Sequence, residues 1–162
     1  PDPTTFFTSI QTGEQRSEGF EADFIFEPTP AFSLLATYAY TDARVIADTV
    51  IPAGDQLPRV PEHQGRIAAR YRFLNGALEG FELGAGLTGA SETVITLPNG
   101  AEVDGCVVAV AQASYIVGRI RVGLRVDNRF NSDYFVPYQY FAQDVVRPGN
   151  PRSAFVTVGF EL

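Results

Sequence analysis

Long runs in which apolar and polar residues alternate are the feature that most constrains the fold of this chain. Residues 81–88 read FELGAGLT, so Phe, Leu, Ala and Leu share one face of an extended chain and Glu, Gly, Gly and Thr share the other. Residues 66–73 (RIAARYRF) and 120–127 (IRVGLRVD) follow the same rule. Because successive side chains of a β-strand point to opposite faces, this period of two predicts strands with one apolar face.

Runs of this kind, separated by Gly, Pro, Asn and Asp, predict an all-β chain of about eight antiparallel, up-and-down strands. These strands span approximately residues 4–11, 16–27, 32–42, 64–73, 81–92, 105–116, 119–130 and 152–162. The chain has 162 residues, which is the size of one domain. We therefore interpret residues 1–162 as a single β-barrel segment.

Strand length and loop length both favour a transmembrane barrel. Many of the predicted strands have about ten to twelve residues, whereas the mean strand has about five to six and a tilted membrane strand needs about nine to eleven. Residues 28–31, 74–80 and 117–118 form short connections, and residues 43–63, 93–104 and 131–151 form long ones. Outer-membrane barrels combine short periplasmic turns with long extracellular loops. A soluble sandwich or barrel gives the same alternation and stays open as an alternative.

Composition argues against several other classes of protein. Twelve basic and 19 acidic residues give a net charge of 12 − 19 = −7, and without a basic run this argues against nucleic-acid binding. The single cysteine, Cys106, excludes an intrachain disulfide and a cysteine-based zinc site. His63 is the one histidine, and no G-x-S-x-G motif accompanies it. We therefore expect no enzymatic activity, no metal site and no cofactor.

Several short motifs resemble those of one family in their order and spacing. They are RSEGFEAD (16–23), LATYAYTD (35–42), RVPEH (59–63), RYRF (70–73), LGAGLTGAS (83–91), LRVDNRFNSDY (124–134) and PGNPR (148–152). Together they make the chain similar to the C-terminal β-barrel part of a TonB-dependent outer-membrane receptor of the ferric-siderophore type. The chain departs from that pattern at its end, where Leu162 replaces the usual aromatic residue.

The resemblance implies a location in the outer membrane of a Gram-negative bacterium, in contact with lipid, and a role in TonB-dependent uptake of ferric siderophores. The resemblance implies a barrel of about 22 strands with a plugged lumen. This chain would then form about the last third of that barrel. The TonB system would act through an N-terminal plug that this chain lacks. Two alternatives stay open: a stand-alone eight-stranded outer-membrane barrel with a structural or adhesive role, and a soluble β-barrel that binds a small apolar ligand.

The polar faces and the last long loop supply the candidate functional residues. Arginines on the polar faces are expected to pair with acids there or to guide an anionic ferric chelate. The arginines are Arg66, Arg70, Arg72, Arg121 and Arg125, and the acids are Glu21, Asp23, Glu82 and Asp127. In the loop, aromatic rings and an arginine could hold a siderophore by stacking and charge-assisted hydrogen bonds. These ligand-binding candidates are Tyr134, Tyr138, Tyr140, Phe141 and Arg147. An interfacial aromatic belt with loop packing is the alternative interpretation.

Overall fold

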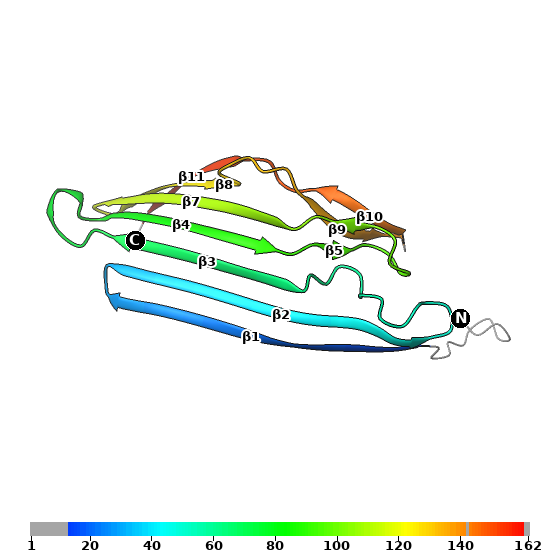
Figure 1. Ribbon diagram of the computed structural model, residues 1–162. Helices are drawn as coiled ribbons and strands as arrows, with labels where there is room; N and C mark the ends of the chain where they lie inside the picture. The colour runs from blue at the N-terminus through cyan, green and yellow to red at the C-terminus, as the bar shows by residue number, and fades with distance from the viewer. Residues whose placement is uncertain (1–12, 142, 161–162) are drawn as a thin grey trace.

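The computed structural model describes residues 13–141 and 143–160, and most of these residues belong to one curved antiparallel sheet (Figure 1). Its seven strands follow the order β1-β2-β3-β4-β7-β8-β11, and each strand pairs with the next long strand of the chain. The strands are β1 (Gly13–Thr29), β2 (Phe32–Asp48), β3 (His63–Arg72), β4 (Phe81–Ala90), β7 (Cys106–Val117), β8 (Ile120–Asp127) and β11 (Ser153–Phe160). The predicted up-and-down antiparallel arrangement is therefore confirmed.

The sequence predicts all seven described long strands, and the main differences lie at the ends of β1 and β2. The predicted strand at residues 4–11 lies outside the described residues. Strands β1 and β2 each have 17 residues, so both continue several residues beyond the predicted boundaries of 16–27 and 32–42. A β-bulge between Glu14 and Gln15 lets this long hairpin keep its pairing as far as Gly13 and Asp48.

The long connecting segments contain short hairpins that the sequence analysis treats as loop. Two of these segments each contribute one small two-stranded sheet, β5 with β6 and β9 with β10. The strands are β5 (Thr93–Val94), β6 (Glu102–Val103), β9 (Phe135–Tyr140) and β10 (Gln143–Pro148). At the opposite end of the sheet the connections are tight, and the longest of them contains one 3-10 turn, η1 (Gly76–Leu78). The predicted contrast between short turns and long loops is confirmed.

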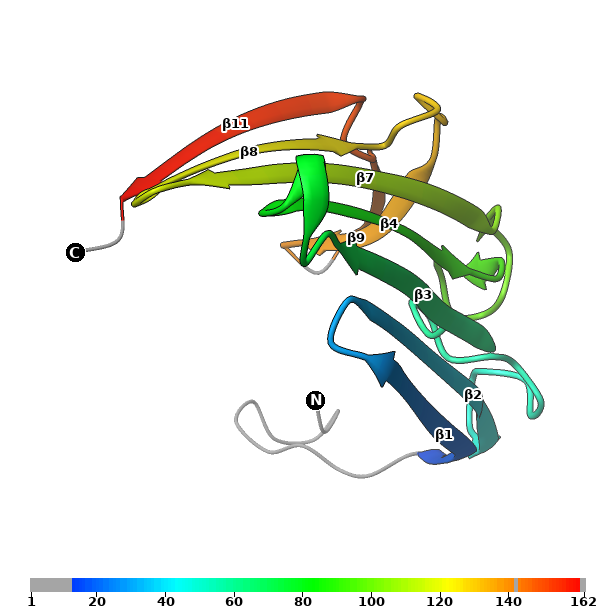
Figure 2. The same cartoon turned by 90° about the vertical axis from the view of Figure 1, so that its left-hand side faces the viewer.

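The sheet curves strongly but stays open within the described residues. Figure 2 shows the sheet turned by 90° from Figure 1, as an arc that runs from β11 through β4 to β1. Strand β1 pairs with β2 and strand β11 pairs with β8, and the described residues of β1 and β11 form no ladder with each other. In the part of the chain that the structure describes, no helix is long and apolar enough to cross a membrane.

The two faces of the sheet differ in chemistry. The β9–β10 hairpin lies on the concave side in Figure 2, and Tyr134 at its base shares a hollow with Glu21, Asp23 and Arg66. The charged side chains therefore face the concave side. The convex side carries large apolar residues that no other part of the described chain covers: Val156 is 72% exposed and Val158 is 70% exposed. A soluble barrel would bury this face, whereas a membrane barrel exposes it to lipid.

Two rows of aromatic rings border the convex apolar face. The loop-side aromatic belt consists of Phe20, Tyr38, Tyr40 and His63, whose neighbouring ring centroids lie 5.2–6.2 Å apart. The turn-side aromatic belt consists of Tyr71, Phe73, Phe81 and Tyr115, with separations of 5.0–6.3 Å. Ten residues of an inclined strand separate His63 from Phe73, which corresponds to roughly 25 Å across the sheet. That distance matches the apolar band of an outer-membrane barrel.

Most of the buried core lies among the loops, although Ala109 of β7, opposite Leu87 in the sheet, is also buried. Ala43 and Val45 are 2% and 1% exposed, and Val94 and Val103 of the β5–β6 hairpin are 4% and 7% exposed. Residues 54–57 cover β2, because Gly54 donates to the Val45 carbonyl and Leu57 donates to the Ala43 carbonyl, each at 2.8 Å. The long loops are thus packed structure that can position side chains.

Candidate functional site

The three long connecting segments meet at one end of the sheet and hold one another in place (Figure 1). The backbone N–H of Asn99 donates to Oδ2 of Asp55 at 2.9 Å, across 44 residues of sequence. The backbone N–H of Arg59 donates to the carbonyl of Val94 at 3.0 Å. These bonds join the loop that follows β2 to the β5–β6 hairpin, so the two segments form one layer.

Arg59 also connects this layer to the third segment. Its Nη1 lies 3.3 Å from Oδ1 of Asp144 on β10, and the two residues are 85 positions apart in the chain. The backbone of Arg59 has a φ of +67°, in the left-handed region that non-glycine residues rarely adopt. Arg59 therefore contacts both of the other long segments, from a left-handed backbone conformation that costs free energy.

Asn128 fixes the base of the β9–β10 segment. Its side chain is buried, and Nδ2 donates to the carbonyls of Ser132 at 2.9 Å and Asn150 at 3.0 Å. Its Oδ1 accepts from the backbone N–H of Ser132 at 2.9 Å. Nearby, Oδ1 of Asn131 accepts from the N–H of Arg152 at 3.0 Å. Two asparagines therefore tie both ends of the loop to the sheet.

Tyr134 belongs to the same base. The N–H of Gly149 donates to the Tyr134 carbonyl at 2.7 Å, and the N–H of Asn150 donates to the Tyr134 hydroxyl at 3.3 Å. A Cβ atom on Gly149 would lie 2.1 Å from the Tyr134 ring, so glycine is required for this close packing. The PGNPR and NSDY motifs thus meet in space, and Tyr134 has a structural function at this point.

The remaining loop candidates lie further out on the β9–β10 hairpin. Tyr138 on β9 and Arg147 on β10 share one face, with the guanidinium carbon 5.8 Å from the ring centroid, a cation–π contact. Tyr140 and Phe141 form an edge-to-face pair with centroids 4.5 Å apart. They are 58% and 84% exposed at the tip of the hairpin. The structure therefore brings four predicted residues onto one exposed hairpin, and their contact with a ligand stays a prediction.

Two side chains with shifted pKa values lie on the part of β2 beyond the loop-side aromatic belt. The backbone N–H groups of Val50 and Ile51 donate to Asp48 Oδ1 at 2.8 and 3.1 Å, and these bonds lower the pKa of the Asp48 carboxyl. Arg44 lies between Asp42 and Glu62, and its hydrogen bond with Asp42 raises the pKa of the guanidinium. Both arrangements order the loop that follows β2.

The concave face confirms part of the predicted charge pairing. Arg72 contacts Glu82 at 3.0 Å, and Arg125 contacts Asp127 at 2.7 Å. The predicted pairing is not found for Arg66 and Arg70 within residues 13–141 and 143–160, and the alternative function for them stays a prediction. The register explains the result for Arg66: its neighbours across the sheet are Thr37 and Thr88, and Asp23 lies two strands away.

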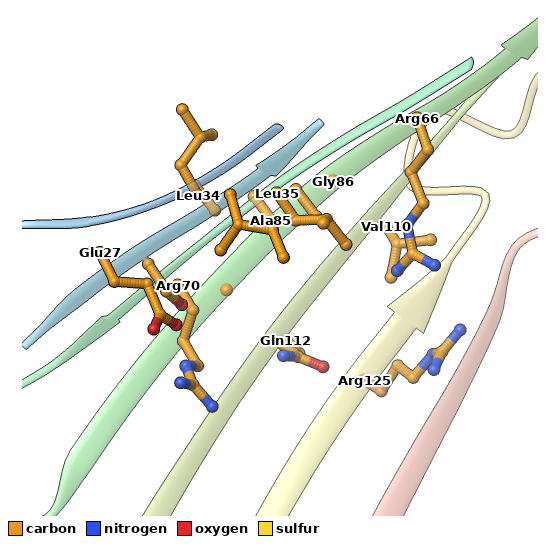
Figure 3. Close-up of a pocket in the computed structure, with 15 residues that line it drawn as sticks. Glu27, Leu34, Leu35, Arg66, Arg70, Ala85, Gly86, Val110, Gln112 and Arg125 are labelled. Atoms are coloured by element: carbon orange, nitrogen blue, oxygen red, sulfur yellow. The ribbon is translucent and has the colours of Figure 1, made fainter. Parts of the chain in front are cut away.

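Arg66 and Arg70 border a hollow of about 370 Å³ on the concave face (Figure 3). Gln112 and Arg125 project from the strands on its other side. In Figure 3 these polar side chains extend to one side of the sheet, whereas Leu34 extends to the other. Both arginines can be recognised in the sequence, whereas the hollow cannot, because it depends on the small residues that pair beside them, such as Gly84 and Gly86.

Metal-ligating residues do not gather in the described part of the chain. No group of three or more His, Cys, Asp or Glu residues there could hold a metal ion. Nδ1 of His63 lies 2.7 Å from the Tyr38 hydroxyl, within the loop-side aromatic belt. Cys106 has a free thiol and lines the hollow beneath Tyr134.

An exposed apolar convex face, a charged concave face and packed loops at one end define the wall of an outer-membrane β-barrel. Comparison with known families gives the particular class. The TonB dependent receptor-like β-barrel family matches residues 1–129, and the chain belongs to this family. Its members are receptors and transporters.

Relatives and solved structures agree with this assignment. The metal-pseudopaline receptor of Pseudomonas aeruginosa is 32% identical over 155 residues, which cover 94% of this chain and 22% of the relative. The ferrichrome outer membrane transporter/phage receptor of Escherichia coli is 30% identical over 138 residues, covering 82% of this chain and 18% of the relative. The siderophore receptor PiuA from Acinetobacter baumannii superposes with a TM-score of 0.80 at 25% identity, covering 91% of this chain and 22% of that structure. The chain thus spans about a fifth of the length of these relatives.

Proposed function

We propose that this chain forms part of the barrel wall and the extracellular loops of a receptor that takes up ferric siderophores across the outer membrane of a Gram-negative bacterium. The observation that supports this most is the outward apolar face between two aromatic belts, found in a chain of the TonB-dependent receptor family. The names of its relatives supply the cargo, since they include ferrichrome, ferric-pyoverdine and catecholate siderophore receptors.

The β9–β10 hairpin is the proposed capture surface for the siderophore. Tyr140 and Phe141 present exposed rings that could stack on an aromatic or apolar part of a chelate. Arg147 is held against Tyr138 and could donate charge-assisted hydrogen bonds to an anionic oxygen. Because Asn128 fixes the base of the hairpin, these groups would be positioned before the ligand arrives, which lowers the entropy lost on binding.

Energy for uptake would come from the TonB system through an N-terminal plug inside the barrel. The open sheet supports this arrangement, because its charged concave face requires water or another polar surface opposite it. In the assembled receptor the plug and the remaining strands would supply that surface. We propose no catalytic role for any residue of this chain.

Uptake of radioactive iron by iron-starved cells tests the proposal. Cells that carry the receptor as their single siderophore receptor should accumulate iron from at least one of ferrichrome, ferric pyoverdine and a ferric catecholate. The accumulation should stop when TonB is absent or when a proton uncoupler is added. Iron accumulation that is unaffected by loss of TonB, or no accumulation from any of the three chelates, would contradict the proposal.

Variants of the hairpin test the capture surface. Replacing Tyr140 and Phe141 together by Ala should raise the dissociation constant of the chelate on intact, energy-depleted cells about tenfold, because two exposed aromatic contacts are lost. Val146 lies on the opposite face of the same hairpin, so Val146→Ala is the matched control and should leave binding within twofold of the wild type. Equal effects of the two changes would show that the hairpin acts through its fold alone.

Because one relative is named a metal-pseudopaline receptor, the cargo metal also requires a test. The same cells should be supplied with chelated zinc and chelated nickel beside iron. Accumulation of iron alone would support the ferric assignment, and accumulation of zinc or nickel at a comparable rate would replace it with a broader metal-chelate receptor.

A further inference from the structure

The chain contains two asparagine–glycine pairs, which lie at opposite ends of the sheet. Asn75 and Gly76 belong to the turn between β3 and β4, and Asn99 and Gly100 belong to the tip of the β5–β6 hairpin (Figure 1). Both asparagines are exposed, and both pairs are followed by alanine. An asparagine before glycine is prone to spontaneous deamidation, because glycine has no side chain to hinder ring closure. A difference in reactivity between the two pairs would therefore come from the fold.

Deamidation needs water and the peptide itself. The main-chain nitrogen of the following residue loses its proton and attacks Cγ of the asparagine, and the new N–Cγ bond closes a succinimide ring. The Cγ–Nδ2 bond breaks, and ammonia leaves with the proton. Water then opens the ring at either carbonyl and gives aspartate or isoaspartate, with no change in oxidation state. The reaction requires a free N–H on the following residue and a side-chain amide that can turn toward it.

The other three asparagines of the chain each lack the free N–H. The residue after Asn150 is a proline, which has no N–H. The N–H that follows Asn128 donates to a carbonyl of β7 at 2.8 Å. The N–H that follows Asn131 donates to Oδ1 of Asn128 at 2.9 Å. The two asparagine–glycine pairs are therefore the candidates for this reaction.

The fold holds the amide of Asn99 in place. In the orientation that matches donors to acceptors, Nδ2 of Asn99 donates to the carbonyls of Thr96 at 3.1 Å and Gln56 at 3.0 Å, and Oδ1 accepts from the Gln56 N–H at 2.7 Å. The N–H of Asn99 donates to Oδ2 of Asp55 at 2.9 Å. Because ring closure requires this amide to rotate and Nδ2 to leave, it can begin only after these bonds break.

Asn75 has no such restraint. Within residues 13–141 and 143–160 its side chain forms no hydrogen bond. Gly76 has a φ of +80°, and a Cβ atom there would meet no atom within 4 Å, so the attacking nitrogen lies beside open space. The hydrogen bonds that close the turn lie outside the pair: Phe73 donates to Phe81 at 2.9 Å, and Gly80 donates to Phe73 at 3.1 Å. The backbone of the pair can therefore rearrange while the strands stay joined.

We propose that Asn75 is a site of spontaneous deamidation in the folded receptor, and that the contacts of Asn99 protect the same dipeptide at the loop end. This inference does not depend on the proposed uptake function, because it concerns the chemistry of the chain itself.

The product would affect the fold differently at the two positions. At Asn75 the new carboxylate would be exposed at the turn end of the sheet, where the lost amide had no partner. At Asn99 it would lie beside the carbonyls of Thr96 and Gln56, so that acceptor would face acceptor without a proton between them. The fold thus protects the pair whose amide joins two segments of the loop layer.

Mass spectrometry of the full receptor tests the proposal. The receptor in lipid vesicles is incubated in mildly alkaline buffer, which speeds attack by the main-chain nitrogen, and is then digested with a protease that cleaves after glutamate. Glu79 and Glu92 lie between the two asparagines, so each asparagine is measured on its own peptide. Deamidation raises the mass of a peptide by about 1 Da, and chromatography separates aspartate from isoaspartate.

In the folded receptor, Asn75 should deamidate at least tenfold faster than Asn99, because Asn99 reacts only when the loop layer opens locally. The same incubation in denaturant should bring the two rates within threefold of each other. Equal rates in the folded receptor, or a faster reaction at Asn99, would overturn the proposal. A tenfold difference that persisted in denaturant would also overturn it, since the difference would then come from the local sequence.

A variant of the loop layer tests the cause of the protection. Asp55→Ala removes the acceptor of the Asn99 N–H, so it should speed deamidation of Asn99 at least threefold and leave that of Asn75 within twofold of the wild type. Asp133→Ala removes the same charge from an exposed position in another loop and is the matched control, with both rates expected within twofold. An unchanged rate at Asn99 in Asp55→Ala would overturn the protective function of these contacts. The comparison of folded and unfolded wild type decides the proposal even if the variant does not assemble.

Discussion

Asn128 shows how a single side chain determines the position of the β9–β10 hairpin. It satisfies backbone groups of Ser132 and Asn150 from a buried position, and its own φ of +47° is one that asparagine tolerates better than most residues. The motif LRVDNRFNSDY therefore has a physical basis, since its first asparagine bonds to both ends of the loop that follows.

Replacing Asn128 by Ala should destabilise this end of the sheet by about 2–3 kcal/mol, because buried backbone groups lose their partners. Asn128→Gly removes the same hydrogen bonds and accepts the positive φ, so it should cost about 1 kcal/mol less. Thermal unfolding of the purified receptor, combined with hydrogen exchange of residues 132–150, measures both effects. Exchange rates equal to those of the wild type in both variants would contradict this function of Asn128.

For single residues, the sequence shows which positions are important for the site. It shows less well what each of these residues does. The sequence predicts Tyr134 as a ligand candidate because it is aromatic and lies in a long loop. The structure gives its ring a packing partner, Gly149, and its hydroxyl a backbone donor. A pairing between two motifs 15 residues apart depends on loop conformation, and periodicity carries no information about that.

Among the elements, the β9–β10 hairpin depends on its contact with the loop after β2. The Arg59–Asp144 pair is partly exposed, so its contribution to stability is about 1 kcal/mol or less. A contact of this strength adds modestly to the hydrogen bonds that hold the base of the hairpin.

Removing this ion pair should make the hairpin more mobile. Arg59→Ala and Asp144→Ala should each raise amide exchange in β10 two- to fivefold, and the two changes together should have about the same effect as either alone. Reversing both charges, with Arg59→Asp and Asp144→Arg, should restore part of the protection. Fully additive effects of the two single changes would show that the residues act independently.

The strands were predictable because alternation is a local property, whereas the small hairpins required tertiary information. Val136, Tyr138 and Tyr140 do alternate with Phe135, Pro137 and Gln139, a period of two that could have indicated β9. Pro137 argued against a strand, since proline is confined to edges and bulges. The two-residue strands β5 and β6 are too short for any periodic signal.

For the whole molecule, the orientation of the two faces governs insertion into the membrane. Leu87 lies on the convex face near the middle of β4, and Thr88 beside it faces the interior. Leu87→Arg should destabilise the inserted barrel by about 2–4 kcal/mol, the cost of a charge near the bilayer midplane. Thr88→Arg places the same charge in the polar interior opposite Arg66, where like-charge repulsion should cost about 1 kcal/mol or less.

Refolding of the full receptor into lipid vesicles, titrated with denaturant, measures the difference between these two variants. If Thr88→Arg were the more damaging change, the assignment of the convex face to lipid would be wrong. The sequence could predict that one face is apolar, but it could not say which face points outward. The curvature of the sheet and the inward position of the hairpin resolve that question.

Cys106 has a practical consequence for following the receptor in action. It is the one thiol of this chain, and it lines the hollow beneath Tyr134 with Asp23 and Arg66, where the loop layer meets the interior. A fluorescent or spin label attached there would sense the movement of the hairpin above it and the arrival of cargo below it. The protein thus carries a natural attachment point for time-resolved spectroscopy, and a label there tests the proposed capture of cargo without an engineered cysteine in this segment.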